Sequence, residues 1–260
     1  MGLLLLLAAL ILPSPVPSPV NAQAAAPKLT FDVASIRPTK PGVQNGFIKA
    51  LSGGHGYTAQ NMTLKVMISL MYKVPMRQIH GGADWLNEDR YDVEARVDGA
   101  YSLDDLHIMY QNLLADRFHV QLHRETHEGN VYALTVDPSG LKMKPNTSPQ
   151  DYEIPLEGPP AHAVGKRVPM NYLCWYIGQV VQNDARPCVD LTGLTGNYDF
   201  TLSFMPLLPP GASADALPPE YKDLPDIFTA LKEQLGLRLT AQKGPVEDLV
   251  IDHIDKPTEN

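Results

Sequence analysis

Residues 91–97 read Tyr-Asp-Val-Glu-Ala-Arg-Val, so apolar and polar side chains alternate. Because successive side chains of a strand point to opposite faces of its sheet, this alternation predicts a strand with one buried face. A helix is predicted after it, starting at Ser102, with Asp105 as a shorter acid in a capping box. Its buried stripe is expected at Leu103, Leu106, Tyr110, Leu113 and Leu114.

A second helix is predicted before this strand, with Asn61 as its N-cap and Pro75 as its stop. A further strand is expected at residues 31–36. After the helix from Ser102, alternation from Phe118 and an apolar run at residues 131–136 predict a hairpin that turns near Gly129. The apolar face of the second helix follows helical spacing at Leu64, Met67, Ile68, Met71 and Tyr72.

The second half of the chain repeats this order of elements. Residues 198–200, Tyr-Asp-Phe, match residues 91–93, Tyr-Asp-Val, and both Asp92 and Asp199 are expected to cap neighbouring loops. We therefore predict an α+β fold of two tandem similar units, each in strand-helix-strand-strand-helix-strand-strand order. The alternative is one continuous α+β domain whose sheet is shared by both halves. In the second half, helices are predicted from Pro169 and at residues 228–235, and strands at residues 186–189, 198–204, 237–242 and 249–254.

The domain boundaries follow from proline content. Residues 138–168 and the following Pro169 hold seven prolines, and proline is excluded from helix interiors and central strands. This segment is interpreted as a Pro-rich linker or an extended crossover. The predicted organisation is a signal peptide at residues 1–24, a first α+β unit at 25–137, the linker at 138–168 and a second α+β unit at 169–260.

The N-terminus has the pattern of a secretory signal peptide. The apolar stretch at residues 3–12 is too short for a membrane span, which needs about 20 residues. It leads to Ala22-Gln23-Ala24, an A-x-A arrangement that predicts cleavage after Ala24. A positive residue before the apolar stretch is missing, and an uncleaved anchor is the alternative. The mature chain is expected to be exported, periplasmic or extracellular, and to lack a transmembrane span.

Composition excludes some partners and leaves the cysteines open. The 260 residues carry 29 acidic and 21 basic side chains, a formal charge of -8, which disfavours nucleic acid as a partner. Cys174 falls in a predicted helix and Cys188 in the next strand. A disulfide between them and two buried thiols are both open. A C-x-x-C pattern is absent.

Several short motifs together resemble a known family. They include residues 31–35 (Phe-Asp-Val-Ala-Ser), 81–86 (Gly-Gly-Ala-Asp-Trp-Leu), 113–118 (Leu-Leu-Ala-Asp-Arg-Phe), 123–126 (His-Arg-Glu-Thr) and 190–196 (Asp-Leu-Thr-Gly-Leu-Thr-Gly). The chain resembles an exported family of unknown function, abundant as paralogues in soil acidobacteria. The resemblance implies a compartment and a fold but no reaction. Cys188 stands where the family usually has an aliphatic residue, so a disulfide is not implied as a family feature.

The order of elements in each half also resembles a small module at the N-terminus of secretins and TonB-dependent receptors. In those proteins the module serves as a docking surface. This resemblance rests on the pattern of elements alone, and a shared fold does not establish a shared function.

No catalytic residue, metal site or cofactor is predicted. His119, His123 and His127 are spaced four apart in a predicted strand, where four residues span about 13 Å and neighbouring histidines cannot share an ion. The common hydrolase, metalloprotease and nucleotide-binding signatures are absent. The histidines are instead expected on a polar outer face, with Arg124 and Glu125 forming ion pairs across the hairpin.

The candidate binding residues are Asp84 and Trp85 in the first half and Asp190 and Thr192 in the second, at equivalent places of the repeat. The alternative for Trp85 is that it fills the core. The functional hypothesis is a non-enzymatic interaction or ligand-sensing module of the bacterial cell envelope, whose partner is an envelope protein or a small ligand. The alternative is an envelope hydrolase with an unfamiliar site around His80, Asp84 and Glu88.

Overall fold

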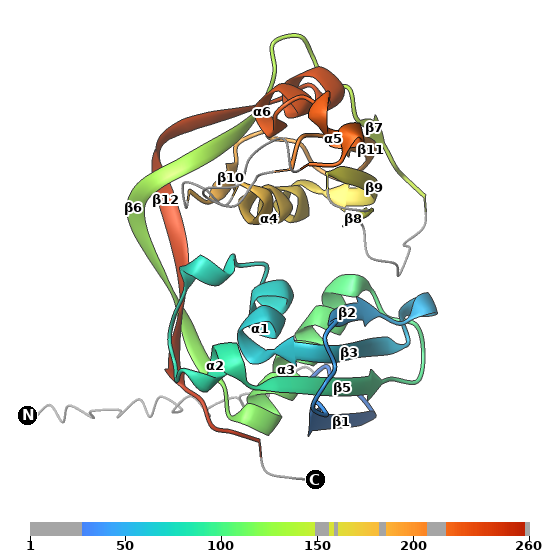
Figure 1. Ribbon diagram of the computed structural model, residues 1–260, viewed down its shortest axis with the longest axis vertical. Coiled ribbons are helices and arrows are strands. Elements are labelled where there is room, and N and C mark those ends of the chain that lie inside the picture. The colour runs from blue at the N-terminus through green and yellow to red at the C-terminus, as the bar shows by residue number, and fades with distance from the viewer. Residues whose placement is uncertain (1–27, 149–155, 159–160, 182–185, 207–216, 258–260) are drawn as a thin grey trace, which may run out of the picture.

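The computed structural model describes residues 28–148, 156–158, 161–181, 186–206 and 217–257. The predicted signal peptide lies outside these residues. The α+β prediction is confirmed, because helices and strands both occur through the described chain. Two lobes lie one above the other and are joined along one side by two long antiparallel strands, which we call the ribbon (Figure 1). The ribbon strands are β6 (Gln121–Val136) and β12 (Leu237–His253).

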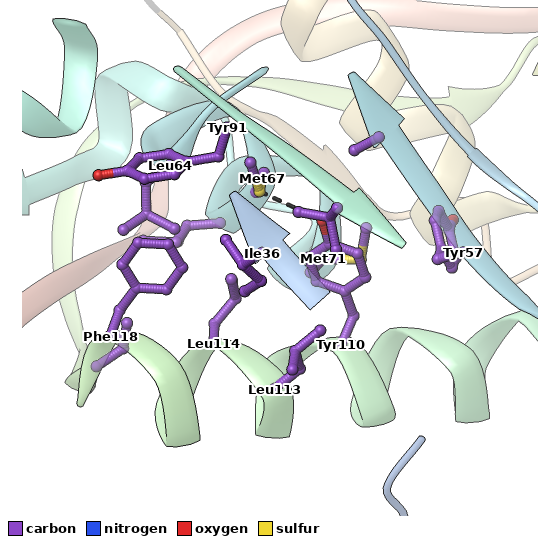
Figure 2. Packing of buried hydrophobic residues seen from close by; sticks show 14 of the residues in the cluster. Ile36, Tyr57, Leu64, Met67, Met71, Tyr91, Tyr110, Leu113, Leu114 and Phe118 are labelled. Atoms are coloured by element: carbon purple, nitrogen blue, oxygen red, sulfur yellow. Dashed lines mark hydrogen bonds between the residues drawn. The ribbon is translucent and has the colours of Figure 1, made fainter. Parts of the chain in front are cut away.

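The first lobe, residues 28–118, is a four-stranded antiparallel sheet packed on helices. The strand order is β1-β5-β3-β2. Figure 2 shows side chains of α3 pointing toward the strands, with Tyr110, Leu114 and Phe118 between them. The main elements are β1 (Val33–Pro38), β2 (Phe47–Ala50), β3 (Gly56–Thr63), α1 (Leu64–Tyr72), β4 (Ile79–Gly81), α2 (Trp85–Glu88), β5 (Arg90–Arg96) and α3 (Leu103–Phe118). Short 3-10 helices are η1 (Ser52–Gly54) and η2 (Met76–Gln78).

The second lobe, the described residues between 137 and 235, has a sheet of order β7-β11-β9-β8. This matches the order in the first lobe, strand for strand. Its elements are β7 (Lys144–Pro145), β8 (Leu156–Glu157), β9 (His162–Pro169), α4 (Met170–Val180), β10 (Cys188–Asp190), β11 (Asn197–Ser203), α5 (Pro219–Lys222), α6 (Ile227–Ala230) and a π-helical turn, η5 (Leu231–Leu235). The duplication stays a prediction, which this shared order supports.

The two aspartates of the repeated triplet make the same contact in each lobe. Asp92 on β5 accepts a hydrogen bond from the Asn61 N–H of β3 (2.9 Å), and Asp199 on β11 accepts one from the Arg167 N–H of β9 (2.8 Å). Both donors have a positive φ, 55° at Asn61 and 54° at Arg167, and each precedes the start of a helix by three residues. Each carboxylate therefore stabilises a strained backbone where a strand turns into a helix.

The third sheet, β10-β6-β12-β4, ties the lobes together. β4 of the first lobe pairs in parallel with the end of β12, and β10 of the second lobe pairs in parallel with β6. As a result, Leu249 and Ile251 lie in the core of the first lobe, while Tyr132 and Leu134 lie in the core of the second. The predicted boundary at residue 137 therefore does not separate two independent cores.

The hairpin predicted near Gly129 is wrong, because β6 runs without a break through that glycine. Gly129 is paired with Gly244 of β12, so the two strands predicted at residues 237–242 and 249–254 are also one strand. The glycines serve close packing: a Cβ on Gly129 would lie 2.6 Å from Cγ2 of Val246, and one on Gly244 would lie 2.9 Å from Cγ2 of Val131.

Two further predictions need correction. The predicted linker contains β9, a central strand that pairs with both β11 and β8. Within β9 the only proline is Pro169, its last residue, so residues 162–168 of the strand keep their N–H donors. Pro145 lies in the edge strand β7. The N-cap of α1 is Thr63, whose Oγ1 accepts from the Val66 N–H, rather than Asn61. The predicted cap of α3 is confirmed, since Ser102 Oγ accepts from the Asp105 N–H at 3.0 Å.

Candidate functional site

A cavity of about 360 Å³ lies between the two lobes and against the ribbon. Pockets that hold small molecules have volumes of roughly 300–1,000 Å³. The first lobe contributes the turn after α1 and η2, the second lobe contributes α4 and β10, and the ribbon closes one side. The lining residues are Lys73, Val74, Pro75, Gln78, Thr126, Asn171, Cys174, Trp175, Pro187, Cys188, Val189, Asp190, Pro245 and Glu247.

The first-lobe wall is built by the way α1 ends. Lys73 adopts a left-handed conformation (φ 53°), and its N–H bonds back to the carbonyls of Leu70 and Ser69. The Ser69 hydroxyl donates to the Val74 carbonyl at 2.7 Å. Pro75 cannot continue a helix, so the chain leaves α1 here and presents Val74 and Pro75 to the cavity.

The second-lobe wall is one face of α4. Asn171, Cys174 and Trp175 follow the i, i+3, i+4 spacing of a helical face, and Gly178 continues it one turn later. The Trp175 ring packs on Tyr172, with ring centroids 5.4 Å apart. A Cβ on Gly178 would lie 3.4 Å from Cγ of Pro75, so α4 approaches the first lobe closely at this glycine.

The segment entering β10 is held from two sides. Nη2 of Arg77 in the first lobe donates to the Arg186 carbonyl at 3.0 Å. The Tyr132 N–H of the ribbon donates to the Pro187 carbonyl at 2.8 Å. The Arg186 guanidinium also lies 5.3 Å from the centroid of the Tyr132 ring. These contacts fix the backbone of Pro187 and Cys188 at the cavity wall.

The charged groups at the wall are already paired. Lys73 Nζ lies 2.7 Å from an Asp104 carboxylate oxygen. Burial opposes ionisation of Asp104, but the hydrogen bond and charge of Lys73 hold its pKa below the ordinary value. Glu247 pairs with Arg124. Asp190 accepts hydrogen bonds from the Thr192 N–H (2.9 Å) and hydroxyl (2.7 Å).

Two wall residues keep unused hydrogen-bonding capacity. Gln78 Nε2 donates to the Glu247 carbonyl at 2.7 Å, yet its Oε1 is buried and has no partner within the described residues. The same holds for the indole Nε1 of Trp175. A buried polar atom without a partner costs free energy comparable to a lost hydrogen bond. Both residues belong to the cavity wall, so a turn of either side chain toward the cavity would offer one acceptor and one donor to a small, largely apolar molecule.

The predicted binding residues lie in two separate places. Asp190 lines the interlobe cavity, and Thr192 is bonded to it. Asp84 and Trp85 lie at α2 of the first lobe and do not line this cavity. Trp85 stacks on Phe118, with centroids 6.4 Å apart and planes at 20°, and the Lys256 ammonium lies 5.6 Å from its centroid. The half-buried Trp85 therefore packs against the core of the first lobe.

The three residues of the hydrolase alternative are not joined by contacts of the described chain. His80 Nε2 lies 3.3 Å from one Asp248 oxygen, and His127 Nδ1 lies 3.3 Å from the other. Asp84 and Glu88 have exposed side chains at α2. His80 thus contacts a carboxylate on β12.

His123 and His127 lie on β6 of the ribbon, whereas His119, predicted in the same strand, is the C-cap of α3. Each of the three contacts a different carboxylate. His119 lies 3.2 Å from Asp255, and His123 lies 2.9 Å from Asp252. The searched residues contain no group of three or more side chains that could hold a metal ion. The expected ion pair of Arg124 forms with Glu247 across the ribbon, while Glu125 bonds to His123 on its own strand.

Sequence reasoning missed most of the cavity wall, including Gln78, Trp175 and Glu247. The wall joins five separate segments of the chain, and no local pattern links them. Proline is the sequence signal that could have indicated this wall. Pro75 follows α1 and Pro187 precedes β10, and both prolines line the cavity.

Fold and cavity together define a two-lobed α+β protein with a binding-sized cavity between lobes that share strands. The chain belongs to the family described as protein of unknown function (DUF3738), whose model matches residues 65–254. No curated protein and no solved structure matches the chain. Among the described helices, none has both the length and the apolar character needed to cross a membrane.

Proposed function

We propose that this protein is an exported, non-enzymatic binding module of the bacterial cell envelope that holds a small ligand between its lobes. The interlobe cavity carries the proposal, because both lobes and the ribbon line it. A ligand that contacts both lobes favours whichever relative position of the lobes gives the better contacts, which is how a binding site becomes a sensor. The signal-like residues 1–24 support export.

The chemistry of the wall defines the ligand class. Val74, Pro75, Pro187 and Val189 offer apolar surface, and the ring of Trp175 offers a flat face for an aromatic group. The unpartnered Gln78 and Trp175 atoms match a donor and an acceptor on the same molecule. A small aromatic or heteroaromatic amide has these features.

The test is a screen of aromatic amide fragments by ligand-detected NMR and thermal unfolding of the mature protein. Asn171 is exposed and lines the cavity, so Asn171→Trp is expected to fill the cavity without disturbing the core. Fragments that bind the native protein should bind this variant about tenfold more weakly or worse. Asn130→Trp, on an exposed ribbon position away from the cavity, is the matched control and should bind normally. Equal affinity for both variants, or no fragment binding at all, would overturn the proposal.

A further inference from the structure

Cys174 and Cys188 bring their sulfur atoms together at the cavity wall. Their Sγ atoms lie 2.8 Å apart, one on α4 and the other on β10, and both residues line the interlobe cavity. A disulfide bond is about 2.05 Å long, so a small movement of the side chains joins the two sulfurs. They are the chain's only cysteines.

The surrounding structure holds both cysteines in this position. Cys188 is paired with Tyr132 of β6, and the preceding carbonyl of Pro187 accepts the Tyr132 N–H. Cys174 lies in the interior of α4 and is packed in the core of the second lobe. Gly178, one turn further along α4, would place a Cβ 4.0 Å from the Cys188 nitrogen, so the helix and β10 are in close contact here.

The two thiols differ in accessibility. Cys174 is buried, while Cys188 is half-buried and is therefore the more accessible of the two. This arrangement resembles a pair in which the accessible thiol reacts first and the buried thiol resolves the product.

We propose that Cys174 and Cys188 form an intramolecular disulfide by exchange with a low-molecular-weight disulfide, and that this bond fixes α4 to β10 at the cavity wall. The Cys188 thiol loses its proton and its thiolate attacks the external disulfide, which releases one thiolate and leaves a mixed disulfide on Cys188. The Cys174 thiol then loses its proton and its thiolate attacks Sγ of Cys188, which releases the second thiolate. Two protein thiols are oxidised and one external disulfide is reduced.

Intact-mass spectrometry after alkylation tests the bond on the mature protein. The protein is equilibrated with oxidised glutathione, denatured without reductant and treated with iodoacetamide. We expect a monomer without alkyl groups or glutathione adducts, and two alkyl groups after prior reduction with dithiothreitol. Two alkylated thiols in the oxidised sample, a stable glutathione adduct or a disulfide-linked dimer would each overturn the proposal.

Single variants test the order of the two steps. Cys174→Ala leaves the half-buried Cys188 and should take up one glutathione, whereas Cys188→Ala leaves the buried Cys174 and should react about tenfold more slowly or less. Equal rates in the two folded variants would overturn the assigned order. Hydrogen exchange of α4 and β10 amides should be slower in the oxidised than in the reduced wild type, and unchanged by oxidant in Cys188→Ala. Equal exchange in the oxidised and reduced wild type would overturn the proposal that the disulfide fixes α4 to β10.

Discussion

Asp137, just past the end of β6, is a buried carboxylate whose contacts control its ionisation. Its oxygens accept from the Ser139 N–H (2.9 Å) and hydroxyl (2.7 Å), and Arg238 at the start of β12 lies 3.0 Å away. The hydrogen bonds from Ser139 lower the pKa of Asp137 most, and Arg238 lowers it further. The pKa therefore falls to about 2 from its ordinary 3.8.

Because its pKa is lower in the folded state, Asp137 stabilises the fold above its ordinary pKa, and this contribution is lost as pH falls from about 4 to about 2. Asp137→Asn is expected to be less stable than wild type at pH 7, and the difference should shrink across that window. Urea unfolding of both proteins between pH 7 and pH 2 measures it. A difference that stays constant with pH would contradict the role given to this carboxylate.

The close packing of the two ribbon strands requires glycines in the part of the ribbon that runs between the lobes. A Cβ on Gly129 would come within 2.6 Å of Val246 Cγ2, and valine is stiff at χ1, so the neighbour cannot easily move away. Gly129→Ala is therefore expected to destabilise the protein by about 1–3 kcal/mol through overpacking.

A double-mutant cycle with Val246→Ala isolates this clash. The second substitution removes the Cγ2 atom. The double variant should therefore lose less free energy of unfolding than the two single variants lose in sum. Urea denaturation of the four proteins gives the coupling free energy. Simple additivity would show that Gly129 is needed for another reason.

At the level of elements, periodicity in the sequence predicts what lies within one segment. The helices α1, α3 and α4 and the cap at Ser102 depend on local sequence, so they could be predicted. The capping role of Asp92 could be predicted from the repeated triplet. The unbroken course of β6 could not, because Gly129 has the signal of a turn and only its partner Gly244, more than a hundred residues away, shows its packing role. In the same way, the local loop motif indicated Asp190 as a candidate binding residue. No local pattern indicated Gln78 or Trp175, which reach the cavity only through tertiary packing.

The whole molecule is held together by exchanged strands, which makes the lobes mutually dependent. Leu249 of β12 is fully buried in the first lobe, although its strand begins in the second. Two units that folded independently would each bury only their own residues. We therefore expect the described lobes to unfold as one cooperative system, in contrast to the two separate units that the boundary at residue 137 implies.

The chain has two tryptophans, one for each lobe: Trp85 lies on α2 and Trp175 on α4. Trp85→Phe and Trp175→Phe variants each leave a single fluorescent reporter. Leu249→Ala should destabilise the protein by about 2–5 kcal/mol, since it empties a core position.

Both reporters should shift to the same lower urea midpoint, because a transition without populated intermediates gives coincident curves with different probes. Ala241→Ser, at an exposed ribbon position, is the control and should move neither curve by much. If the Trp175 signal keeps its midpoint while the Trp85 signal shifts, the second lobe folds without the first. The ribbon would then be a connection between two stable domains, and a ligand in the cavity would act on their relative position alone.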